Sequence, residues 1–484
     1  VESRGLGDVY KRQTIEDMKS LKYIWILCLS CLAAGLTSCN EEDKYFDSKY
    51  QSTKIVVDQI YLEDYESSVP DRPVTFARLG QLIRVEGSGL YGMKKVYING
   101  YETYFNRAYV TDHSMLIQIN SNTPVEDAEE ADRNKIRFVK DDATLEHPFI
   151  IRAASPTITG ISNTLPKDKE KVTVYGTGLQ ETTKVTLPGG IEITADIESD
   201  EDGEWYSFIM PENYSGSGSI YSEGANGQAA TPAYFNFADC MILDFDGNGS
   251  QGFWSWSETG SMINADDLVE DPYDSGRGKC VQIVPERLLK AGVISGKPRV
   301  SECWTAGNDD AADDWSRMYS YIPATTPLTE VALQFDVYVP EAWSGTGHLQ
   351  ISLFNNFNFG GIGSDDDGAS NQVAFYVPWI QEGAIVPFST TGWQTVTIPF
   401  SQFNKYATMI EDKESPVFQN VVEDRNAATY RNFGMGFVNT DFTYQDVSIT
   451  STAFSSRIYL DNWRVVPYKT VTISDYPEDE ETTE

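Results

Sequence analysis

Apolar and polar residues alternate along short stretches of this chain, and turn residues separate the stretches. The alternation is clear in residues 82–86 and again in residues 95–98, which Asn99-Gly100 follows. Successive side chains of a strand point to opposite faces, so the pattern predicts strands with one buried face, and Asn-Gly beside them is typical of a hairpin. No amphipathic pattern is longer than about two helical turns. We therefore predict an all-β chain.

Two consecutive segments repeat one plan. Residues 172–175 alternate and lead into a Gly-x-Gly-Leu turn at residues 176–179, and an earlier alternating run leads into the same turn at residues 87–90. The two turns stand 89 positions apart, which is the length of one small sandwich domain. We assign residues 53–153 to a first domain and residues 154–237 to a second.

These two segments resemble immunoglobulin-like plexin/transcription-factor (IPT/TIG) domains. The resemblance rests on a Pro-x-Ile start at residues 156–158, the Gly-x-Gly-Leu turn and a lysine–valine strand after it. The first segment departs from the pattern, because residues 55–57 replace the Pro-x-Ile start and residues 127–133 form an insertion. The resemblance implies tandem immunoglobulin-like β-sandwiches that act as rigid spacers.

Residues 238–468 differ from the segments before them. Eight of the ten tryptophans lie there, and strand patterns continue to the end of the stretch. Two long loops, at residues 301–316 and 360–371, interrupt the strands. Long loops on a rigid sandwich usually carry function. We predict a lectin-like, jelly-roll-like β-sandwich with a binding surface built from its loops and one sheet face.

Alternation also assigns side chains to the two faces of this sandwich. The residues assigned to the outer face are Gln334, Asp336, Tyr338, His348, Gln350, Ser352, Phe354, Gln372, Ala374 and Tyr376. This mixture suits a sugar, because rings pack on the apolar face of a pyranose while amides and carboxylates bond its hydroxyls. The predicted ligand-binding residues are Trp304, Trp315, Gln350, Phe354, Phe357, Tyr376 and Trp379. In the alternative interpretation, these rings fill the core of the sandwich. Three other tryptophans, Trp343, Trp393 and Trp463, are assigned to the core in either case.

The N-terminal residues have the pattern of an export signal. Residues 1–17 lack periodicity and precede Met18, so we treat them as extraneous sequence. Residues 18–38 form a signal peptide with two lysines and an apolar segment, and its Leu-Thr-Ser-Cys end resembles a bacterial lipobox. That resemblance implies lipidation of Cys39, and the acidic residues after it resemble a surface-export signal. We expect residues 39–52 to be a tether that holds the protein on the cell outer membrane, facing the cell surface.

The net charge of the chain limits the classes of partner that it can bind. The chain has 72 acidic and 37 basic residues, a net charge of −35. Such a charge repels nucleic acid and anionic lipid headgroups, so no nucleic-acid partner is expected and a neutral ligand is favoured. Solubility alone would explain the charge equally well. Residues 469–484 are predicted to be an acidic tail.

Cysteines and acidic residues give little sign of a metal. Beyond the signal and Cys39 only Cys240, Cys280 and Cys303 remain, without a Cys-x-x-Cys spacing, so zinc is not expected and one pair at most can form. Residues 244–249 resemble part of a calcium loop but lack its closing glutamate. A structural calcium is therefore the one cofactor considered, with Asp246 and Asp461 as its ligands. The alternative is an Asp/Gly-rich turn.

Three runs carry a more specific resemblance. Residues 335–343, 387–400 and 459–463 resemble the glycan-binding domain of surface glycan-binding proteins, which share this order of lipobox, tether, immunoglobulin-like repeats and C-terminal sandwich. The resemblance implies a carbohydrate-binding β-sandwich for plant polysaccharide of the xyloglucan, mixed-linkage β-glucan or mannan class. It also implies two partners, a SusD-like lipoprotein and a TonB-dependent transporter.

Nothing in the sequence singles out a catalytic group. A glycosidase needs two carboxylates across a cleft, and no pair stands out among the acidic residues. The chain has three histidines and no Gly-x-Ser-x-Gly elbow. We therefore predict a non-catalytic protein. Two alternatives stay open, a jelly-roll glycoside hydrolase or lyase and an adhesin or protein-binding scaffold.

Overall fold

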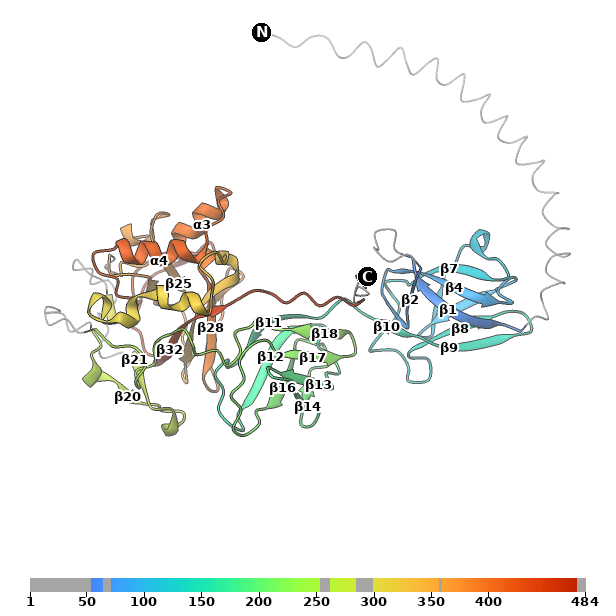
Figure 1. Ribbon diagram of the computed structural model, residues 1–484, viewed down its shortest axis with the longest axis horizontal. Coiled ribbons are helices and arrows are strands. Elements are labelled where there is room, and N and C mark those ends of the chain that lie inside the picture. Colours follow the sequence, from blue (N-terminus) through green and yellow to red (C-terminus); the bar gives the residue numbers. More distant parts are fainter. Residues whose placement is uncertain (1–53, 64–70, 253–261, 284–298, 357–358, 477–484) are drawn as a thin grey trace, which may run out of the picture. The chain divides into compact units, whose positions relative to one another are not determined.

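The computed structural model describes residues 54–63, 71–252, 262–283, 299–356 and 359–476 (Figure 1). The signal peptide, Cys39, the tether, Phe357 and the last part of the acidic tail lie outside the described residues. The chain divides into two compact units, one ending at Ala154 and one beginning at Ser155. In the part of the chain that the structure describes, no helix is both long and apolar enough to span a bilayer.

The first unit is built of strands alone, apart from one short 3-10 helix, η1 (Arg107–Tyr109). Its sheets have the strand orders β2-β1-β4-β7 and β6-β5-β8-β9, and β10 pairs with β3. The strands are β1 (Val56–Leu62), β2 (Arg72–Pro73), β3 (Phe76–Arg78), β4 (Leu82–Ser88), β5 (Lys95–Ile98), β6 (Tyr101–Thr103), β7 (Ser114–Gln118), β8 (Lys135–Val139), β9 (Thr144–Pro148) and β10 (Ile150–Arg152). The predicted hairpin is present, because Asn99 and Gly100 join β5 to β6 with φ of 48° and 81°. Positive φ at both central residues is the geometry that Asn-Gly favours.

The second unit begins with another small sandwich. Its sheets have the orders β11-β12-β16-β15 and β14-β13-β17-β18. The strands are β11 (Thr157–Ile161), β12 (Lys171–Thr177), β13 (Lys184–Leu187), β14 (Ile191–Ile193), β15 (Glu198–Ser199), β16 (Trp205–Ile209), β17 (Tyr221–Gly224) and β18 (Gly227–Ala230). Val172, Val174 and Phe208 are fully buried between the sheets. The alternation in β12 therefore places its apolar face in the core, as predicted.

The repeated Gly-x-Gly-Leu turn has the same structural role in both sandwiches. A Cβ added at Gly87 would overlap the carbonyl oxygen of Val56, and one added at Gly176 would overlap that of Thr157. Each glycine thus lets the turn strand lie close against the first strand of its own sandwich. The two leucines that end the turns are buried. The prediction of tandem immunoglobulin-like sandwiches is confirmed.

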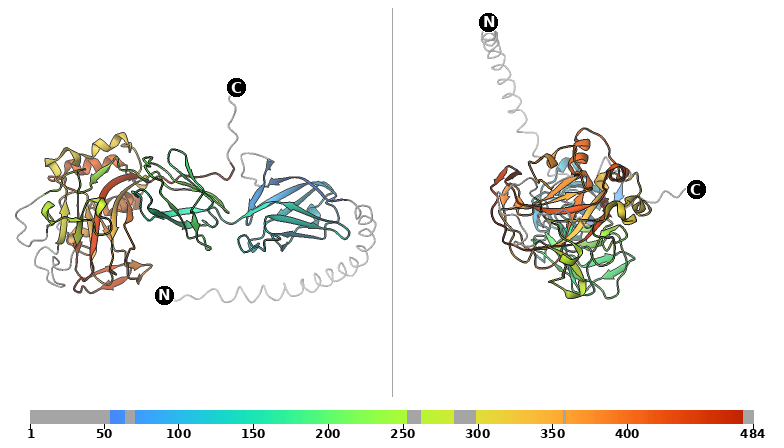
Figure 2. Two further views of the ribbon diagram at one scale, coloured as in Figure 1. Left: turned by 90° about the horizontal axis from the view of Figure 1, so that it is seen from below. Right: turned by 90° about the vertical axis from the view of Figure 1, so that its left-hand side faces the viewer.

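A larger sandwich completes the second unit (Figure 2). One sheet has the order β20-β21-β32-β23-β28 with β19 paired to β32, and the other has the order β22-β29-β24-β25. Its strands are β19 (Met241–Leu243), β20 (Val269–Glu270), β21 (Lys279–Ile283), β22 (Arg299–Trp304), β23 (Val331–Tyr338), β24 (His348–Ser352), β25 (Val373–Tyr376), β26 (Ile380–Gln381), β27 (Ala384–Ile385), β28 (Gln394–Pro399), β29 (Gly434–Val438), β30 (Phe442–Tyr444), β31 (Val447–Ile449) and β32 (Ile458–Pro467). The architecture is all-β, as predicted.

Among the described residues, two α-helices accompany this sandwich, α3 (Asn404–Glu411) and α4 (Phe418–Ala427). The ten residues of α4 exceed the two helical turns that the sequence suggested. Its buried residues Phe418, Val421, Val422 and Arg425 have helical spacing. The charged Arg425 stands where an apolar residue was expected, and this hid the pattern.

A buried polar network joins the two sandwiches of the second unit. The Thr164 hydroxyl donates to Gln334 Oε1 (3.1 Å) and accepts from Arg464 Nη2 (2.8 Å). The Thr395 hydroxyl accepts from the backbone N–H of Thr164 (2.9 Å), and Arg464 pairs with Asp336 at 3.0 Å. The predicted domain boundary between residues 237 and 238 lies inside this unit, and it stays a prediction.

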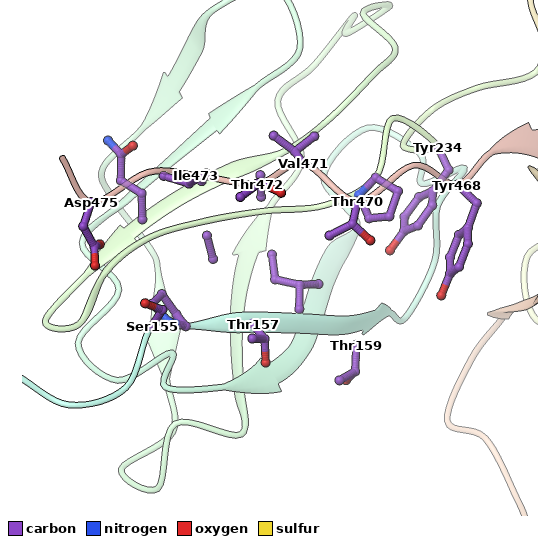
Figure 3. A pocket seen from close by; sticks show the side chains of 16 residues that line it. Ser155, Thr157, Thr159, Tyr234, Tyr468, Thr470, Val471, Thr472, Ile473 and Asp475 are labelled. Atoms are coloured by element: carbon purple, nitrogen blue, oxygen red, sulfur yellow. The ribbon is translucent and has the colours of Figure 1, made fainter. Parts of the chain in front are cut away.

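After β32 the chain returns to the second sandwich. Tyr468 stacks on Tyr234, with ring centroids 6.2 Å apart. Residues 470–473 and Asp475 then line a pocket of about 280 Å³ together with Thr157 and Thr159 of β11 (Figure 3). The first residues of the predicted acidic tail therefore pack against a folded surface.

Candidate functional site

The outer face of β24 carries the candidate site. Leu349 and Ile351 point into the core between the two sheets, and His348, Gln350 and Ser352 point to the other face, as alternation predicted. All five side chains are fully buried. The outer face is therefore covered by other parts of the domain instead of lying open to water.

Two aromatic rings lie flat on the strand beside it. In β29 this face carries Gly434, Gly436 and Val438, and a Cβ on the two glycines would overlap the rings of Trp304 and Phe359, respectively. The two rings stack on each other, with centroids 4.7 Å apart and planes 17° apart. The Trp304 indole N–H donates to Glu302 Oε2 at 3.1 Å. Bare glycine backbone thus makes room for an aromatic layer on the sheet.

Residues 359–363 cover β24 itself. The backbone N–H of Gly361 donates to Gln350 Oε1 (2.8 Å), and that of Ile362 donates to His348 Nε2 (3.2 Å). Gly361 has φ of +82°, and a Cβ there would stand 2.8 Å from His348 Nε2. We call this stretch the covering segment. Two backbone hydrogen bonds and the close packing of Gly361 hold the covering segment against β24.

Three polar atoms under this layer lack a hydrogen-bond partner within the described residues. They are His348 Nδ1, Gln350 Nε2 and Ser352 Oγ. A buried unpaired polar group costs about 1–3 kcal/mol, so native interiors contain few of them. Here three occur at every second position of one strand. The regular spacing places the three atoms in one row on β24.

The hydrogen bonds already made fix what this row offers. Because His348 Nε2 accepts a hydrogen bond, the proton of the neutral ring is assigned to Nδ1, which is then a donor. Gln350 uses its oxygen on Gly361, so its amide N–H groups stay free. Burial lowers the pKa of His348 to about 3, which keeps the ring neutral at ordinary pH. The row is a set of uncharged donors, which fits a neutral ligand rich in oxygen acceptors.

The structure brings only Trp304 and Gln350 of the predicted site together on this face. Trp304 is 1% exposed, so it presents no open shelf. Both remain predicted ligand-binding residues.

Tyr376 lies on the opposite face from the prediction. It pairs with Leu349 across β24 and β25, and its ring packs on Phe335 (5.6 Å) and Trp343 (6.2 Å) in the core. Phe375 takes the outer position instead and meets the His348 ring at 5.7 Å. Val373 and Ala374 are both buried. With both faces of β25 covered, alternation could not tell one from the other.

The expected exposure of three other rings is wrong. Trp315, in the 3-10 helix η7 (Trp315–Ser320), lies under the Arg425 guanidinium at 3.7 Å and packs on Phe433. Trp379 is fully buried, with its indole N–H on the Gly347 carbonyl (3.0 Å), and Phe354 is buried in the same core. Their loops wrap over the sheets, so rings in polar loop sequence became core residues.

Sequence reasoning missed one exposed ring near this site. Tyr430 is 56% exposed, and its carbonyl accepts from the backbone N–H of Asn355, three residues beyond Ser352. The only signal in the sequence was an aromatic residue in an Asn- and Arg-containing loop. His348 and Ser352 were assigned to the correct face but were not counted among the ligand-binding residues.

The residues around Asp246 and Asp461 do not fit calcium. The Asp244 carboxylate accepts three backbone N–H groups of its own loop, which is the turn alternative, and Asp246 accepts the Lys279 backbone N–H (3.0 Å). Burial and the neighbouring Asp336 raise the pKa of Asp461. In the described part of the chain no three His, Cys, Asp or Glu side chains gather to hold a metal. Calcium prefers six to eight oxygen ligands.

The three remaining cysteines, Cys240, Cys280 and Cys303, are buried and unpaired. Burial raises the pKa of the Cys240 thiol to about 12. These thiols are core residues and close no disulfide.

Comparison with known proteins concerns the sandwich that carries this face. Residues 235–467 match the family model described as the surface glycan-binding protein B xyloglucan binding domain. An IPT/TIG domain-containing protein of Bacteroides ovatus is 27% identical over 315 residues, which is 64% of this chain and 52% of that protein. This chain thus spans about half the length of that curated relative.

One solved structure supports the fold. The surface glycan-binding protein PbSGBP-B from Prevotella bryantii superposes with a TM-score of 0.56 and 20% identity, over 86% of this chain and 99% of that one. An SGBP-B from a complex xyloglucan utilization locus in Bacteroides uniformis has a TM-score of 0.43 and 15% identity, over 85% and 99% of the two chains. The resemblance predicted from the sequence is confirmed: residues 235–467 belong to the surface glycan-binding protein B xyloglucan binding domain family.

Proposed function

We propose that the C-terminal sandwich binds a neutral plant polysaccharide of the xyloglucan, mixed-linkage β-glucan or mannan class on the outer face of β24, without altering it chemically. One observation carries the proposal: within the described residues, three unpartnered donors stand in a row on β24, beside the ring of Trp304 that lies on Gly434. The family of this domain supports a glycan as the ligand.

The length of the row favours a polymer over a single sugar. Side chains two residues apart on one face of a strand are about 7 Å apart, so the row from His348 to Ser352 extends over about 13 Å. Several sugar residues in sequence are needed to reach all three donors. Their hydroxyl and ring oxygens would accept the hydrogen bonds that the protein leaves unmade.

Binding at this face requires the covering segment to move. It is held by backbone hydrogen bonds to Gln350 and His348. Sugar hydroxyls can donate to Gln350 Oε1 and His348 Nε2 in place of the two backbone N–H groups, so displacement of the segment exchanges hydrogen bonds without losing them. We infer that the glycan takes the place of residues 359–363 over β24.

Affinity electrophoresis tests the proposal. The whole protein is run in gels containing xyloglucan, mixed-linkage β-glucan or glucomannan, beside Gln350→Leu. We expect at least one polysaccharide to retard the wild type and the variant to run as it does in a plain gel. Equal retardation of both proteins would exclude this face, and no retardation in any gel would exclude the ligand class.

We propose that this face is non-catalytic. Among the described residues, His348 is the one histidine on the outer face of β24. With a pKa of about 3, its ring is too weak a base to act as a general acid or general base near neutral pH. We expect no reducing sugar to be released when the protein is incubated with a polysaccharide that it binds. Steady release would instead favour a glycoside hydrolase.

The location and partners of the protein are further parts of the proposal. We propose that Cys39 carries lipid, that the protein faces outward from the outer membrane, and that it supplies glycan to a SusD-like lipoprotein and a TonB-dependent transporter. The signal pattern and the order of domains support this. Cys39→Ala should abolish labelling by a radioactive fatty acid and release the protein from the membrane fraction.

A further inference from the structure

The first unit contains a pocket of about 450 Å³ that is separate from the site on β24. Its walls include Tyr91, Met93, Lys94, Phe105, Arg107 and Val110. They come from the turn before β5 and from the loop that carries η1. Met93 and Phe105 are buried and form the apolar floor.

The charge of this pocket is opposite to that of the chain. Lysine and arginine line it and no carboxylate does, although the chain carries 72 acidic and 37 basic residues. Lys94 has a carboxylate of Asp141 at 3.5 Å, whereas Arg107 forms no ion pair among the described residues. A guanidinium without a partner at the wall of a pocket favours an anion, above all a carboxylate that it can bind with two parallel hydrogen bonds.

Two exposed rings lie next to this pocket in the sequence. Tyr104 is 79% exposed and Tyr109 is 61% exposed, and each is adjacent in sequence to a residue of the pocket wall. They are the most exposed of the large hydrophobic side chains described. Rings left in water offer flat faces on which the C–H side of a sugar can pack.

The backbone holds these groups in place. Asn106 Oδ1 accepts from the N–H of Ala108 (3.0 Å) and so caps η1, and the N–H of Val110 returns to the carbonyl of Arg107 (3.2 Å). Arg107 and Tyr109 therefore lie on one short, hydrogen-bonded turn. A positioned cation beside a positioned ring is a suitable arrangement for an acidic sugar.

We propose that this pocket is a second saccharide site, which takes a uronic acid residue of an acidic glycan. Arg107 and Lys94 bind the carboxylate, and Tyr104 and Tyr109 pack on the ring. The site differs from the one on β24 in both charge and ligand.

Calorimetric titration of the whole protein with oligogalacturonate tests the proposal. We expect binding that weakens about tenfold in Arg107→Gln, the loss typical of a charge-assisted hydrogen bond. Tyr109→Ala should weaken it by a similar factor. Lys54→Gln removes one exposed positive charge from the same unit without touching the pocket, and it should bind as the wild type does.

Further titrations separate this proposal from binding by charge alone and from binding at the β24 site. Methyl-esterified oligogalacturonate, which lacks the charge, should bind about tenfold more weakly, and xyloglucan binding should be the same in Arg107→Gln as in the wild type. Polyglutamate carries carboxylates without sugar rings and should bind poorly. The proposal is overturned if oligogalacturonate does not bind the wild type, if polyglutamate binds equally well, or if Lys54→Gln loses as much affinity as Arg107→Gln.

Discussion

At the scale of single residues, the most informative feature is a set of hydrogen bonds that the fold leaves unmade. Gln350 uses its oxygen on Gly361 and leaves its nitrogen free, and His348 uses only one of its two ring nitrogens. The Ser352 hydroxyl has no partner among the described residues. Alanine at position 352 would avoid this cost. Such residues reduce stability, and in our proposal a ligand completes their bonds.

Ser352→Ala should therefore separate binding from stability. We expect the variant to bind polysaccharide about five- to tenfold more weakly, the value of one neutral hydrogen bond. Its free energy of unfolding should be unchanged or slightly higher, because a buried unpaired hydroxyl is removed. Titration calorimetry and urea unfolding give the two quantities.

Ser207→Ala is the matched control. Ser207 in β16 is also buried with an unpartnered hydroxyl, but it lies in the second sandwich. Its loss should leave polysaccharide affinity unchanged. If Ser352→Ala binds as tightly as Ser207→Ala, Ser352 is not a ligand-binding residue.

His348 gives a prediction for pH. The unfolded chain takes up a proton on this ring near the ordinary pKa of 6.5, whereas burial keeps the folded ring neutral down to about 3. The unfolded state then binds more protons in this window, so folded stability falls as pH drops through it. Between pH 7 and pH 5 this loss of folding free energy amounts to about 2 kcal/mol.

The check is urea unfolding at both pH values. His348→Gln should lose about 2 kcal/mol less than the wild type on going from pH 7 to pH 5. The wild type, unfolded beside the variant at both pH values, is the reference. Equal losses in the two proteins would mean that His348 is protonated in the folded state.

At the scale of elements, sequence patterns predicted the strands well and the coverage of their faces poorly. The Asn-Gly hairpin and the alternation of β24 were read correctly, because both depend on local backbone geometry. The reversed face of β25 and the burial of Trp315 depend on which loop covers which sheet. Nothing local in the sequence encodes that contact. Gly434 and Gly436 were the one sequence feature that indicated a covered face, because two glycines on one face of a strand leave space for rings to pack there.

The covering segment gives a prediction at this scale. Gly361→Ala should loosen it, because positive φ disfavours a side chain and the new Cβ would stand 2.7 Å from Val438 Cγ1. A segment that must leave before the glycan binds lowers the apparent affinity, so loosening it should raise the affinity. Hydrogen exchange of the Gly361 and Ile362 amides and polysaccharide titration measure both effects.

Gly363→Ala is the control for this experiment. Gly363 has the same φ of +82°, but a Cβ there meets nothing within 4 Å. Both alanine variants therefore have the same backbone strain, and only Gly361→Ala adds a Cβ that overlaps neighbouring atoms. If Gly361→Ala binds no more tightly than Gly363→Ala, the glycan does not displace the covering segment.

At the scale of the whole molecule, the second unit joins a spacer-like sandwich to the binding sandwich through buried polar groups. Arg464 is fully buried and depends on Thr164 and Asp336 for partners. A buried charge that loses a partner is costly, so this contact couples the stability of the two sandwiches.

Thr164→Val tests the coupling. The change leaves Gln334 and Arg464 each without one hydrogen bond, and we expect the free energy of unfolding to fall by about 1–3 kcal/mol. Thr157→Val, which removes an exposed contact between Thr157 and Thr177 in the same sandwich, should cost much less. Thermal unfolding of the two variants decides whether the network stabilises the unit.

The most direct test of the account is a crystal structure of the protein with a xyloglucan oligosaccharide. The account predicts that sugar oxygens lie within about 3 Å of His348 Nδ1, Gln350 Nε2 and Ser352 Oγ, with residues 359–363 displaced from β24. A sugar bound elsewhere on the C-terminal sandwich, with those three atoms still unpaired beneath the covering segment, would contradict it.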